Sequence, residues 1–337
     1  MNNTISFKEM NTPLVSIMIP TYNQSNYIAD TINSVLKQDY PELEIIVSDD
    51  CSIDDTEKIV KSFKDDRIRY LKQKTNIGRV ANYHKLLYEY AVGEWVLNLD
   101  GDDLLLDKRF ISSAISATKV KKQPVFIFAD RYEKDDPFFI TTYTDNIDTS
   151  TIEYLDGTAY VLSLPKPKYH IHHLSVLYNR TMAISINFYR SDIISSDYES
   201  LWRLALENTI VHIPSRVAIW RRHSKNASRT VGIDSNIKNY QLFQNVYDYS
   251  IQNIDKKYKP LFEKWLIRNV ANKFYGGICK FLKLGDFNSL VILSHYINTN
   301  YPSSFKRVLL SPKTIIKSIF SLLVGLKHRL QKVLIKI

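Results

Sequence analysis

An apolar run that ends in a cluster of carboxylates constrains this chain more than any other feature of its sequence. Residues Trp95–Leu99 have the length and composition of a buried β-strand. Three aspartates follow at once: Asp100, Asp102 and Asp103. Like charges this close are unfavourable unless a cation or hydrogen bonds compensate them. In an extended chain Asp100 and Asp102 point to the same side, and oxygen ligands favour hard cations such as Mg²⁺ or Mn²⁺. The alternative is a solvated acidic turn.

Strands and helices alternate before this cluster. Short β-type runs lie at 14–20, 43–48 and 68–71, and apolar residues recur at helical spacing at 27–38, 56–63 and 79–90. Asp55 or Thr56 can begin the second helix. The alternation predicts an α/β domain with a mostly parallel sheet, whose ligands bind beyond the carboxyl ends of the strands. Because Asp49 and Asp50 end the second strand, we expect them to meet the acidic cluster in one crevice.

Four motifs occur in a suggestive order. They are Pro20-Thr21-Tyr22-Asn23, the acidic turn from Ser48 to Thr56, Asn76-Ile77-Gly78, and Leu99-Asp100-Gly101-Asp102-Asp103. Together they resemble the ordered signature of family 2 glycosyltransferases over residues 14 to about 115. The resemblance implies a GT-A fold, a nucleotide-sugar donor and inversion at the anomeric carbon. One departure is Cys51, where the family usually has glycine or another small residue.

The resemblance also implies a role for individual residues. Donor-binding roles fall on Pro20, Tyr22, Asp50, Arg79 and Asp100, and metal ligation falls on Asp102. Tyr22 would lie beside the nucleotide base, and Asp50 would accept a hydrogen bond from the imide N–H of uracil. Asp100 would approach the ribose or a water on the metal, which we expect to be Mn²⁺ or Mg²⁺. For Arg79 the alternative is a solvated residue on a helix.

A catalytic base is expected in the stretch from Asn187 to Leu206, which resembles the family's acidic segment at the start of a helix. Asp197 matches the aspartate of that segment, whereas Ser196 replaces a glutamate that often precedes it. The acceptor hydroxyl needs a base as it attacks, so Asp197 is the predicted base and Glu199 the second candidate. Alternatively, Ser196 or Asp197 serves only as a helix N-cap.

Two short β segments are predicted at 211–214 and 217–223. The segment from Trp220 to Ser228 resembles the family's closing element, which in some members returns to the diphosphate. It implies that Arg222 contacts phosphate and that His223 contacts the metal or phosphate. A structural histidine on an edge strand is the alternative for His223.

Other metal and cofactor chemistry is disfavoured. His170, His172 and His173 lack a nearby cysteine pair, which makes acceptor-loop or surface histidines a better interpretation than a zinc site. Cys51 and Cys279 lie in different regions, so no disulfide framework is expected and a reducing cytoplasm fits. No G-x-G-x-x-G follows the first strand, which disfavours a nicotinamide dehydrogenase.

Charge divides the chain unevenly. Its net charge is +10, yet residues 1–235 carry 28 Lys and Arg against 31 Asp and Glu, while residues 236–337 carry 17 against 4. We therefore predict a polar tail at 1–12, a GT-A domain at 13–235 and a basic helical region at 236–337, with helices at 237–254 and 258–284. We expect no signal peptide in the polar tail. A basic tail favours an anionic partner surface.

The segment from Lys313 to Ile337 has the pattern of a basic amphipathic helix. Its apolar stripe is formed by Ile319, Leu323, Leu326, Leu330, Val333 and Ile337. Such a helix suits the interface of an anionic membrane, although packing on its own domain is the alternative. The uncharged run 318–326 is too short to span a bilayer. We expect a cytoplasmic protein that is peripheral at the inner face of the cell membrane.

The combined prediction is a metal-dependent inverting glycosyltransferase. It would move a hexosyl or N-acetylhexosaminyl group from a nucleotide-diphosphate donor, a UDP-sugar in the leading interpretation, to a hydroxyl of a glycan or lipid-linked glycan in surface polysaccharide synthesis. The alternative is a non-catalytic nucleotide-sugar-binding scaffold protein at the membrane. Nucleic acid is not an expected partner, because no recognised DNA or RNA module accompanies the basic tail.

Overall fold

A computed structural model describes residues 12–119, 123–135, 148, 151–224, 226 and 232–311. The chain forms two compact units. The sheet unit contains Met1–Gly157, Tyr169–Asp192 and Ser196–Ser224. The helical unit contains Thr158–Lys168, Ile193–Ser195 and Lys225–Ile337.

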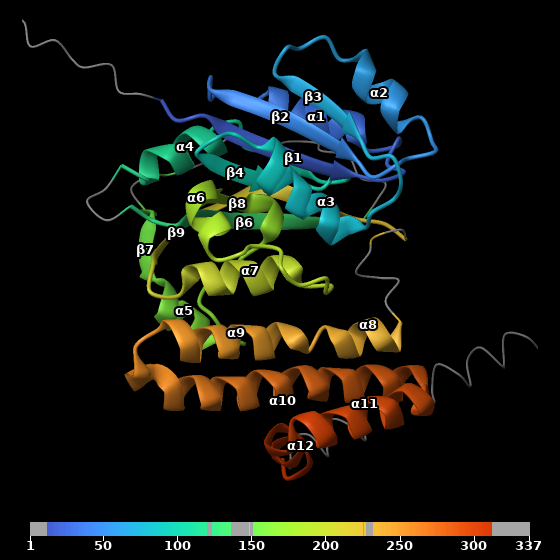
Figure 1. Cartoon of the computed structure of the whole chain (residues 1–337), viewed down its shortest axis with the longest axis vertical. Coiled ribbons are helices and arrows are strands. Elements are labelled where there is room, and N and C mark those ends of the chain that lie inside the picture. The colour runs from blue at the N-terminus through green and yellow to red at the C-terminus, as the bar shows by residue number, and fades with distance from the viewer. Residues whose placement is uncertain are drawn as a thin grey trace, which may run out of the picture. The chain divides into compact units, whose positions relative to one another are not determined.

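The sheet unit begins with four parallel strands, which confirms the alternating pattern predicted from the sequence. The strands are β1 (Val15–Thr21), β2 (Leu43–Asp49), β3 (Ile68–Lys72) and β4 (Trp95–Asn98), in the order β3-β2-β1-β4. The helices between them are α1 (Ile28–Leu36), α2 (Thr56–Ser62) and α3 (Arg79–Lys85), which continues into the π-helical turn η1 (Leu86–Tyr90). All residues of β1 and β4 are buried, as expected for parallel strands covered on both faces (Figure 1).

Further strands extend this sheet beyond β4 and make it mixed. They are β5 (Leu104–Leu105), β6 (Phe126–Asp135), β7 (Glu153–Asp156), β8 (Val176–Asn179) and β9 (Thr209–Arg222). The order continues β4-β8-β6-β9-β5, and β7 pairs with β9. The accompanying helices are α4 (Phe110–Ala117), the 3₁₀ turn η3 (His173–Ser175), α6 (Arg180–Ser185) and α7 (Ser196–Ala205).

Strand β9 differs from the prediction of two short segments, because it is one strand of 14 residues. Proline cannot donate a ladder hydrogen bond, so Pro214 predicted a break. The structure accommodates it with an irregularity in the pairing to β6, where Ala129 faces Ile213 but the next residue, Asp130, faces Arg216. The second half of β9 then pairs with β5, which directly follows the acidic cluster.

The helical unit contains α5 (Gly157–Ser163), most of whose residues belong to it, and the helices that follow the sheet unit. Those are α8 (Ile233–Lys238), α9 (Gln241–Asn253), the 3₁₀ turn η4 (Lys256–Tyr258), α10 (Lys259–Leu284), α11 (Phe287–Asn300) and α12 (Pro302–Leu309). The helix predicted at 237–254 begins at Gln241 instead. The helix predicted at 258–284 is confirmed, and it ends at Gly285, whose φ of 63° is the left-handed conformation typical of a helix C-cap. Trp265 Nε1 donates to the Val161 carbonyl at 2.7 Å.

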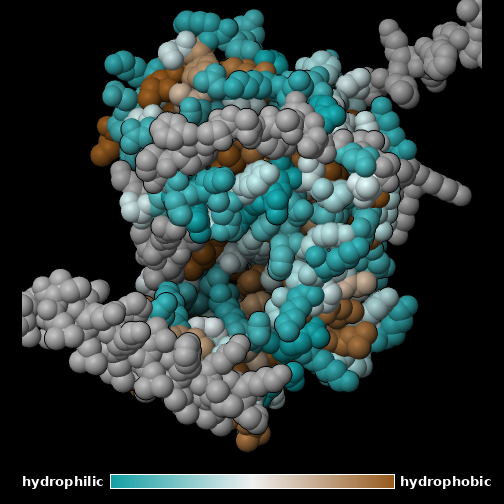
Figure 2. All heavy atoms as spheres, turned by 180° about the vertical axis from the view of Figure 1, so that it is seen from behind, coloured by the Kyte–Doolittle hydropathy of each residue, from teal (hydrophilic) through white to brown (hydrophobic). Residues whose placement is uncertain are grey.

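Hydrophilic residues cover most of the coloured surface in the space-filling view, and apolar residues gather in separate patches (Figure 2). Within the described part of the chain, no helix combines the length and the hydropathy needed to cross a bilayer. The amphipathic helix predicted at 313–337 lies outside the described residues.

Candidate donor and metal site

The acidic cluster lies in a tight turn directly after β4. The backbone N–H of Asp103 donates to the carbonyl of Asp100 at 2.9 Å, which closes a four-residue turn. The chain is therefore not extended here, contrary to the geometry assumed from the sequence. Gly101 donates its N–H to the Pro20 carbonyl at 3.1 Å. A Cβ at Gly101 would lie 2.9 Å from Oγ1 of Thr21, the last residue of β1, so glycine lets the turn approach the end of β1 this closely.

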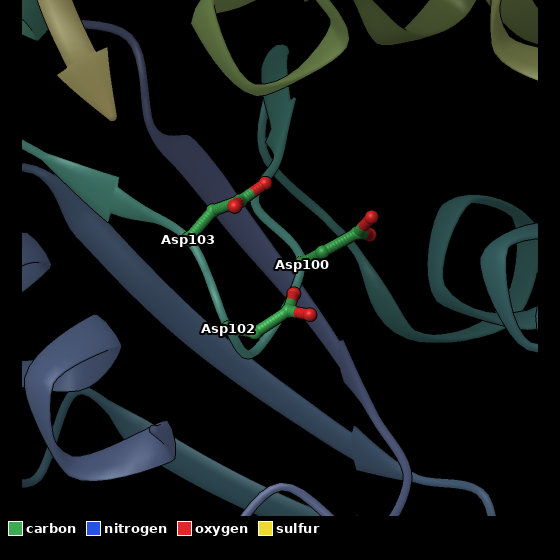
Figure 3. A group of neighbouring side chains, drawn as sticks. All are labelled: Asp100, Asp102 and Asp103. Atoms are coloured by element: carbon green, nitrogen blue, oxygen red, sulfur yellow. The ribbon is translucent and has the colours of Figure 1, made fainter. Parts of the chain in front are cut away.

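The three carboxylates are close enough to share one cation. One ligand oxygen from each of Asp100, Asp102 and Asp103 lies within 4.8 Å of the others. The side chains of Asp100 and Asp102 leave the turn toward the same side (Figure 3). Burial and the nearby Asp102 carboxylate raise the pKa of Asp100. The pKa of Asp103 is raised well above its usual value by burial and by both neighbouring carboxylates. Concentrated negative charge in a buried turn favours a cation.

Asp100 is oriented by side chains from the sheet and from α3. Tyr83 donates its hydroxyl to Asp100 Oδ1 at 2.7 Å, and Asn98 Nδ2 donates to the same oxygen at 3.1 Å. The Arg79 guanidinium lies 5.3 Å from the centre of the Tyr83 ring. Burial opposes it, but Tyr83, Asp197 and Asp100 together raise the pKa of Arg79. Arg79 thus places a fixed positive charge near the acidic turn.

His223 reaches the acidic turn because β9 pairs beside it. Leu104 faces Ile219 and Leu105 faces Ala218, so the end of β9 runs alongside the turn. His223 Nε2 lies 2.8 Å from Asp102 Oδ2, and the side chains are 9% and 11% exposed. The imidazole of His223 stacks on the Tyr27 ring, with centroids 4.7 Å apart. Residues 102 and 223, far apart in the sequence, are therefore brought into contact.

The two arginines before His223 have different partners. The backbone N–H of Arg221 donates to Asp103 Oδ1 at 3.1 Å, and its guanidinium pairs with Asp30 Oδ2 at 3.1 Å. Arg222 instead pairs with Asp135 at 2.7 Å and with Glu133 at 3.5 Å. A phosphate contact by Arg222 remains a prediction, since its charge is already partly balanced on β6.

The other predicted donor residues gather at the same edge of the sheet. Asp50 receives the backbone N–H groups of Ile77 at 2.7 Å and Gly78 at 2.9 Å, and donates its own N–H to the Thr21 carbonyl at 2.9 Å. Gly78 has a φ of 89°, which side chains rarely tolerate. Because both Asp50 and Gly101 bond to the last residues of β1, the second-strand acids and the acidic turn share one edge. Tyr22, which is 47% exposed, follows there.

The loops after β1 and β2 are joined by hydrogen bonds. Asn23 donates its N–H to Ser52 Oγ at 2.8 Å and accepts the N–H of Ile53 at 2.9 Å. Asp54 accepts the backbone N–H of Ser25 at 3.0 Å and that of Thr56 at 3.0 Å. Although burial raises it, hydrogen bonds from Thr56 and Ser25 lower the pKa of Asp54 overall. These contacts fix the loop that carries Tyr22.

The structure separates the two candidates for the base. Glu199 is fully buried in α7 and pairs with Arg203 Nε at 2.8 Å and Arg190 Nε at 3.2 Å. A carboxylate held this way has no route to a substrate hydroxyl. The Asp197 side chain is 14% exposed, and its Oδ2 lies 4.0 Å from His173 Nδ1. Asp197 and Asp100 both act on the charge of Arg79, so the predicted base belongs to the same group of charges as the acidic turn.

Comparison with known proteins assigns the family. The chain matches the model of Glycosyl transferase family 2 over residues 16–186, just over half of its length. The chain belongs to glycosyl transferase family 2. This confirms the resemblance read from the four motifs.

Two known glycosyltransferases match this chain over stretches of fewer than 100 residues. The poly(ribitol-phosphate) β-N-acetylglucosaminyltransferase TarS of Staphylococcus aureus is 38% identical over 93 residues, which is 27% of this chain and 16% of that protein. The GalNAc(5)-diNAcBac-PP-undecaprenol β-1,3-glucosyltransferase of Campylobacter jejuni is 43% identical over 97 residues, which is 28% of this chain and 31% of that protein. These matches span about a third or less of each relative.

Solved structures confirm the GT-A fold along nearly the whole chain. The crystal structure of TarS residues 1–349 in complex with UDP-GlcNAc superposes with a TM-score of 0.66 and 17% identity, covering 94% of this chain and 92% of that one. The mannosyltransferase PcManGT of Pyrobaculum calidifontis in complex with GDP-Man and Mn²⁺ gives a TM-score of 0.55 and 15% identity, with coverage of 95% and 88%.

The residues of the acidic turn fit a divalent cation of the kind that the family implies. Asp102 and His223 offer one oxygen and one nitrogen 2.8 Å apart, and Asp103 and Asp100 add further oxygens nearby. Carboxylate and imidazole ligands together suit Mn²⁺, and carboxylates also suit Mg²⁺. Burial first, and then repulsion between the carboxylates, raises the pKa of Asp100 and of Asp103, and such a cation would offset both effects.

Two residues near the site were not singled out from the sequence. His173 was grouped with two other histidines as an acceptor-loop or surface residue, yet its side chain is only 11% exposed and lies against Asp197. Tyr83 is fully buried and bonds to Asp100. Its position four residues after Arg79 on a helix was the available signal, because residues at that spacing are neighbours. No local signal distinguished His173 from His170 or His172.

Proposed function

We propose that this chain is a metal-dependent inverting glycosyltransferase that uses a UDP-sugar donor. The observation that carries the proposal is the acidic turn with His223 at its side, set near Arg79 and Asp197 in one group of charges. The TarS structure holds UDP-GlcNAc, which supports uridine as the donor nucleoside. A non-catalytic scaffold would have no use for a second, partly exposed carboxylate beside such a turn.

The roles within the donor pocket follow from chemistry and position. Exposed Tyr22 offers a ring for the nucleotide base, and the Asp50 carboxylate accepts the imide N–H of uracil in addition to the backbone N–H groups it already holds. The Pro20 backbone shapes the pocket, because its carbonyl fixes Gly101. Asp100, oriented by Tyr83, faces the ribose or the metal. Arg79 lies beside the diphosphate, and Arg222 is the outer phosphate contact.

The reaction has two requirements on opposite sides of the transferred sugar. A base must take the proton of the acceptor hydroxyl, and positive charge must stabilise the departing nucleoside diphosphate. Asp197 takes the proton of the acceptor hydroxyl as its oxygen bonds to the anomeric carbon, and the bond from that carbon to the donor phosphate breaks with its electron pair. Asp102 and His223 would hold Mn²⁺ or Mg²⁺, which when bound supplies Lewis-acid stabilisation of a nucleoside diphosphate. Arg79 adds a fixed positive charge for the departing group.

The acceptor class is proposed to be a glycan or a lipid-linked glycan of a surface polysaccharide. The two relatives support this class, because one is a transferase for poly(ribitol-phosphate) and the other for an undecaprenol-linked glycan. The transferred group is proposed to be a hexose or an N-acetylhexosamine, since these relatives are a glucosyl- and an N-acetylglucosaminyltransferase.

The test is a transfer and hydrolysis assay over UDP-, GDP- and dTDP-sugars with polysaccharide and polyprenol-linked acceptors. Turnover is expected with a UDP-sugar and Mn²⁺, and EDTA should abolish it. Proton NMR of the product should show inverted anomeric configuration. Absence of binding and turnover for every donor would contradict the proposal. Full activity in EDTA would agree with glycosyl transfer but contradict the proposed metal dependence.

Peripheral attachment to the inner face of the cytoplasmic membrane is a separate part of the proposal. It is supported by the charge of residues 236–337, with 17 basic against 4 acidic residues, because each basic residue near an anionic surface adds about 1 kcal/mol. Full-length protein should float with vesicles containing phosphatidylglycerol, and a chain truncated after Ser311 should not. Equal flotation of both proteins would remove the role of the terminal segment.

A further inference from the structure

A row of polar side chains extends from Asp197 into the core of the sheet unit. His173 Nδ1 lies 4.0 Å from Asp197 Oδ2. On the other side of the ring, His173 Nε2 lies 2.8 Å from the Tyr189 hydroxyl, which in turn lies 3.2 Å from the Tyr178 hydroxyl. The four residues come from α7, η3, β8 and the loop before α7. Only Asp197 has a role in the proposed reaction.

The backbone around Tyr189 is strained in a way that serves this arrangement. Tyr189 has a φ of 58° and Asn187 a φ of 55°, a region that non-glycine residues rarely occupy. Two contacts from α7 hold them there. Ser200 Oγ accepts the N–H of Tyr189 at 2.9 Å, and Arg203 donates to the Asn187 carbonyl at 3.1 Å. The buried Glu199–Arg203 pair thus has a structural task, which is to fix the loop that delivers the Tyr189 hydroxyl.

The charge state of His173 decides the direction of the hydrogen bonds. Burial lowers the pKa of His173; Asp197 and Asp100 oppose this shift, and Arg79 adds to it. Tyr83 and Tyr189 pack against the ring, with centroids 5.7 Å and 6.0 Å away. A neutral imidazole carries one N–H. Nδ1 faces the Asp197 carboxylate, which as a carboxylate can only accept, so the N–H is favoured on Nδ1. Nε2 then accepts from the Tyr189 hydroxyl, which in turn accepts from Tyr178.

We propose that His173 is a positioning residue for Asp197, holding the carboxylate by an Nδ1–H donor that Tyr189 and Tyr178 keep in one tautomer. The inference rests on the proposed function, in which Asp197 is the base. The 4.0 Å separation is longer than a hydrogen bond, and catalytic hydrogen bonds often tighten only when substrate is bound. The donor favours the ionised carboxylate and aims one oxygen, which leaves the other for the acceptor hydroxyl.

The first measurement does not depend on activity. Long-range ¹H–¹⁵N NMR of the histidine rings, in protein labelled with ¹⁵N-histidine, reports which nitrogen carries the proton. His173 is expected as the neutral Nδ1–H tautomer at pH 7. The Tyr189→Phe variant, which keeps the ring but removes the hydroxyl, should shift the balance toward Nε2–H. A wild-type His173 protonated on Nε2, or on both nitrogens, would overturn the proposal.

The second measurement is the pH profile of kcat/KM for His173→Leu and His173→Asn. Leucine removes the donor, so kcat should fall on the order of tenfold, and the acidic limb should move up by about 0.5 to 1 pH unit. KM for the donor should change less than kcat, since His173 reaches the donor side only through its packing against the Tyr83 ring. Asparagine places an N–H near the Nδ1 position, so it should restore the profile. His295→Asn, on the exposed face of α11, is the control.

The outcomes separate the inference from the proposed function. If wild-type protein transfers sugar and Asp197→Asn does not, an unchanged acidic limb in His173→Leu overturns the positioning role alone. If His173→Asn behaves like His173→Leu, the residue acts only through packing and the proposal fails. If the Nδ1–H tautomer is found but no sugar is transferred, the proposed function fails, while the proposed contact between His173 and Asp197 is still supported. If His173→Leu does not fold, Tyr189→Phe provides the same test of the acidic limb of the kcat/KM profile.

Discussion

The two sides of the site in the sheet unit are built in different ways. On the donor side, the loops after β1, β2 and β3 are joined by hydrogen bonds between backbone N–H groups and short polar side chains, as where the Asp50 carboxylate accepts the N–H groups of Ile77 and Gly78. On the base side, Asp197 is placed by side chains from several elements, including the buried Glu199–Arg203 pair and the hydroxyl of Tyr189. The geometry of the donor side therefore depends on contacts between loops, and that of the base side depends on packing among buried side chains.

This difference determines which substitutions should affect binding and which should affect turnover. Several separate hydrogen bonds join the loops of the donor side, so the loss of one leaves the others in place. Substitutions there should therefore mainly change affinity for the nucleotide or metal. The base side has no such support. Removing a buried partner there leaves an unpaired charge, which costs several kcal/mol of stability or misplaces the reacting carboxylate.

The largest effect is expected for Asp197→Asn. The amide keeps the volume but cannot accept the proton, so kcat should fall about 10²- to 10⁴-fold, whereas the affinity for UDP should change little. Steady-state kinetics and isothermal titration with UDP measure the two effects. Asp66→Asn, at an exposed site, is the matched control. A variant that keeps more than a tenth of wild-type kcat would remove Asp197 as the base.

Glu199→Gln should lower the stability of the folded protein but should have little effect on the chemical step. Replacing one member of a buried ion pair leaves Arg203 unbalanced, so the free energy of unfolding should fall by about 3 to 5 kcal/mol. Denaturant titration measures the loss, and kcat per folded molecule should remain within about threefold, a margin well below the effect of losing a base. The opposite pattern, normal stability with no turnover, would make Glu199 the base.

Tyr83→Phe probes the border between the two sides. It removes the hydroxyl that donates to Asp100 at 2.7 Å but keeps the ring beneath Arg79. Groups that orient the residues of a metal site typically change affinity 10- to 100-fold, so the Mn²⁺ concentration for half-maximal rate should rise about tenfold. A metal dependence identical to that of wild type would show that Asp100 needs no such support.

Asp50→Asn should give an effect as small as that of Tyr83→Phe, but confined to the donor. Asparagine has one acceptor oxygen, so it cannot receive both backbone N–H groups and the imide of uracil. KM for the UDP-sugar should rise about tenfold with little change in kcat. Discrimination between UDP and GDP should also weaken. Equal loss of kcat and affinity would mean that a substitution on the donor side also disturbs the chemical step, contrary to the account.

The donor side could be predicted from the sequence because its motifs lie at strand ends. A parallel sheet brings the carboxyl ends of neighbouring strands together, so Asp50 and the acidic turn were expected at one edge. The turn itself was not, since the i and i+2 rule assumed an extended chain, whereas the carbonyl of Asp100 accepts the N–H of Asp103. Gly101 was the available signal of a turn.

The base side could not be predicted in the same detail. The likeness of the stretch 187–206 to a family motif identified Asp197, but nothing local separated it from Glu199, because burial of Glu199 depends on Arg190 and Arg203. His173 was indistinguishable from its neighbours for the same reason. The pairing of β9 with β5, which brings His223 to Asp102, is a register that no periodicity encodes, and Pro214 argued against a continuous strand.

The most direct test of the central claim is Mn²⁺ binding in the presence of UDP, followed by electron paramagnetic resonance for wild-type protein, Asp102→Asn and His223→Gln. The account predicts a bound Mn²⁺ signal in wild type that weakens at least tenfold in both variants, while circular dichroism shows intact folds. Undiminished Mn²⁺ binding by folded Asp102→Asn protein would contradict the claim that the acidic turn holds the cation.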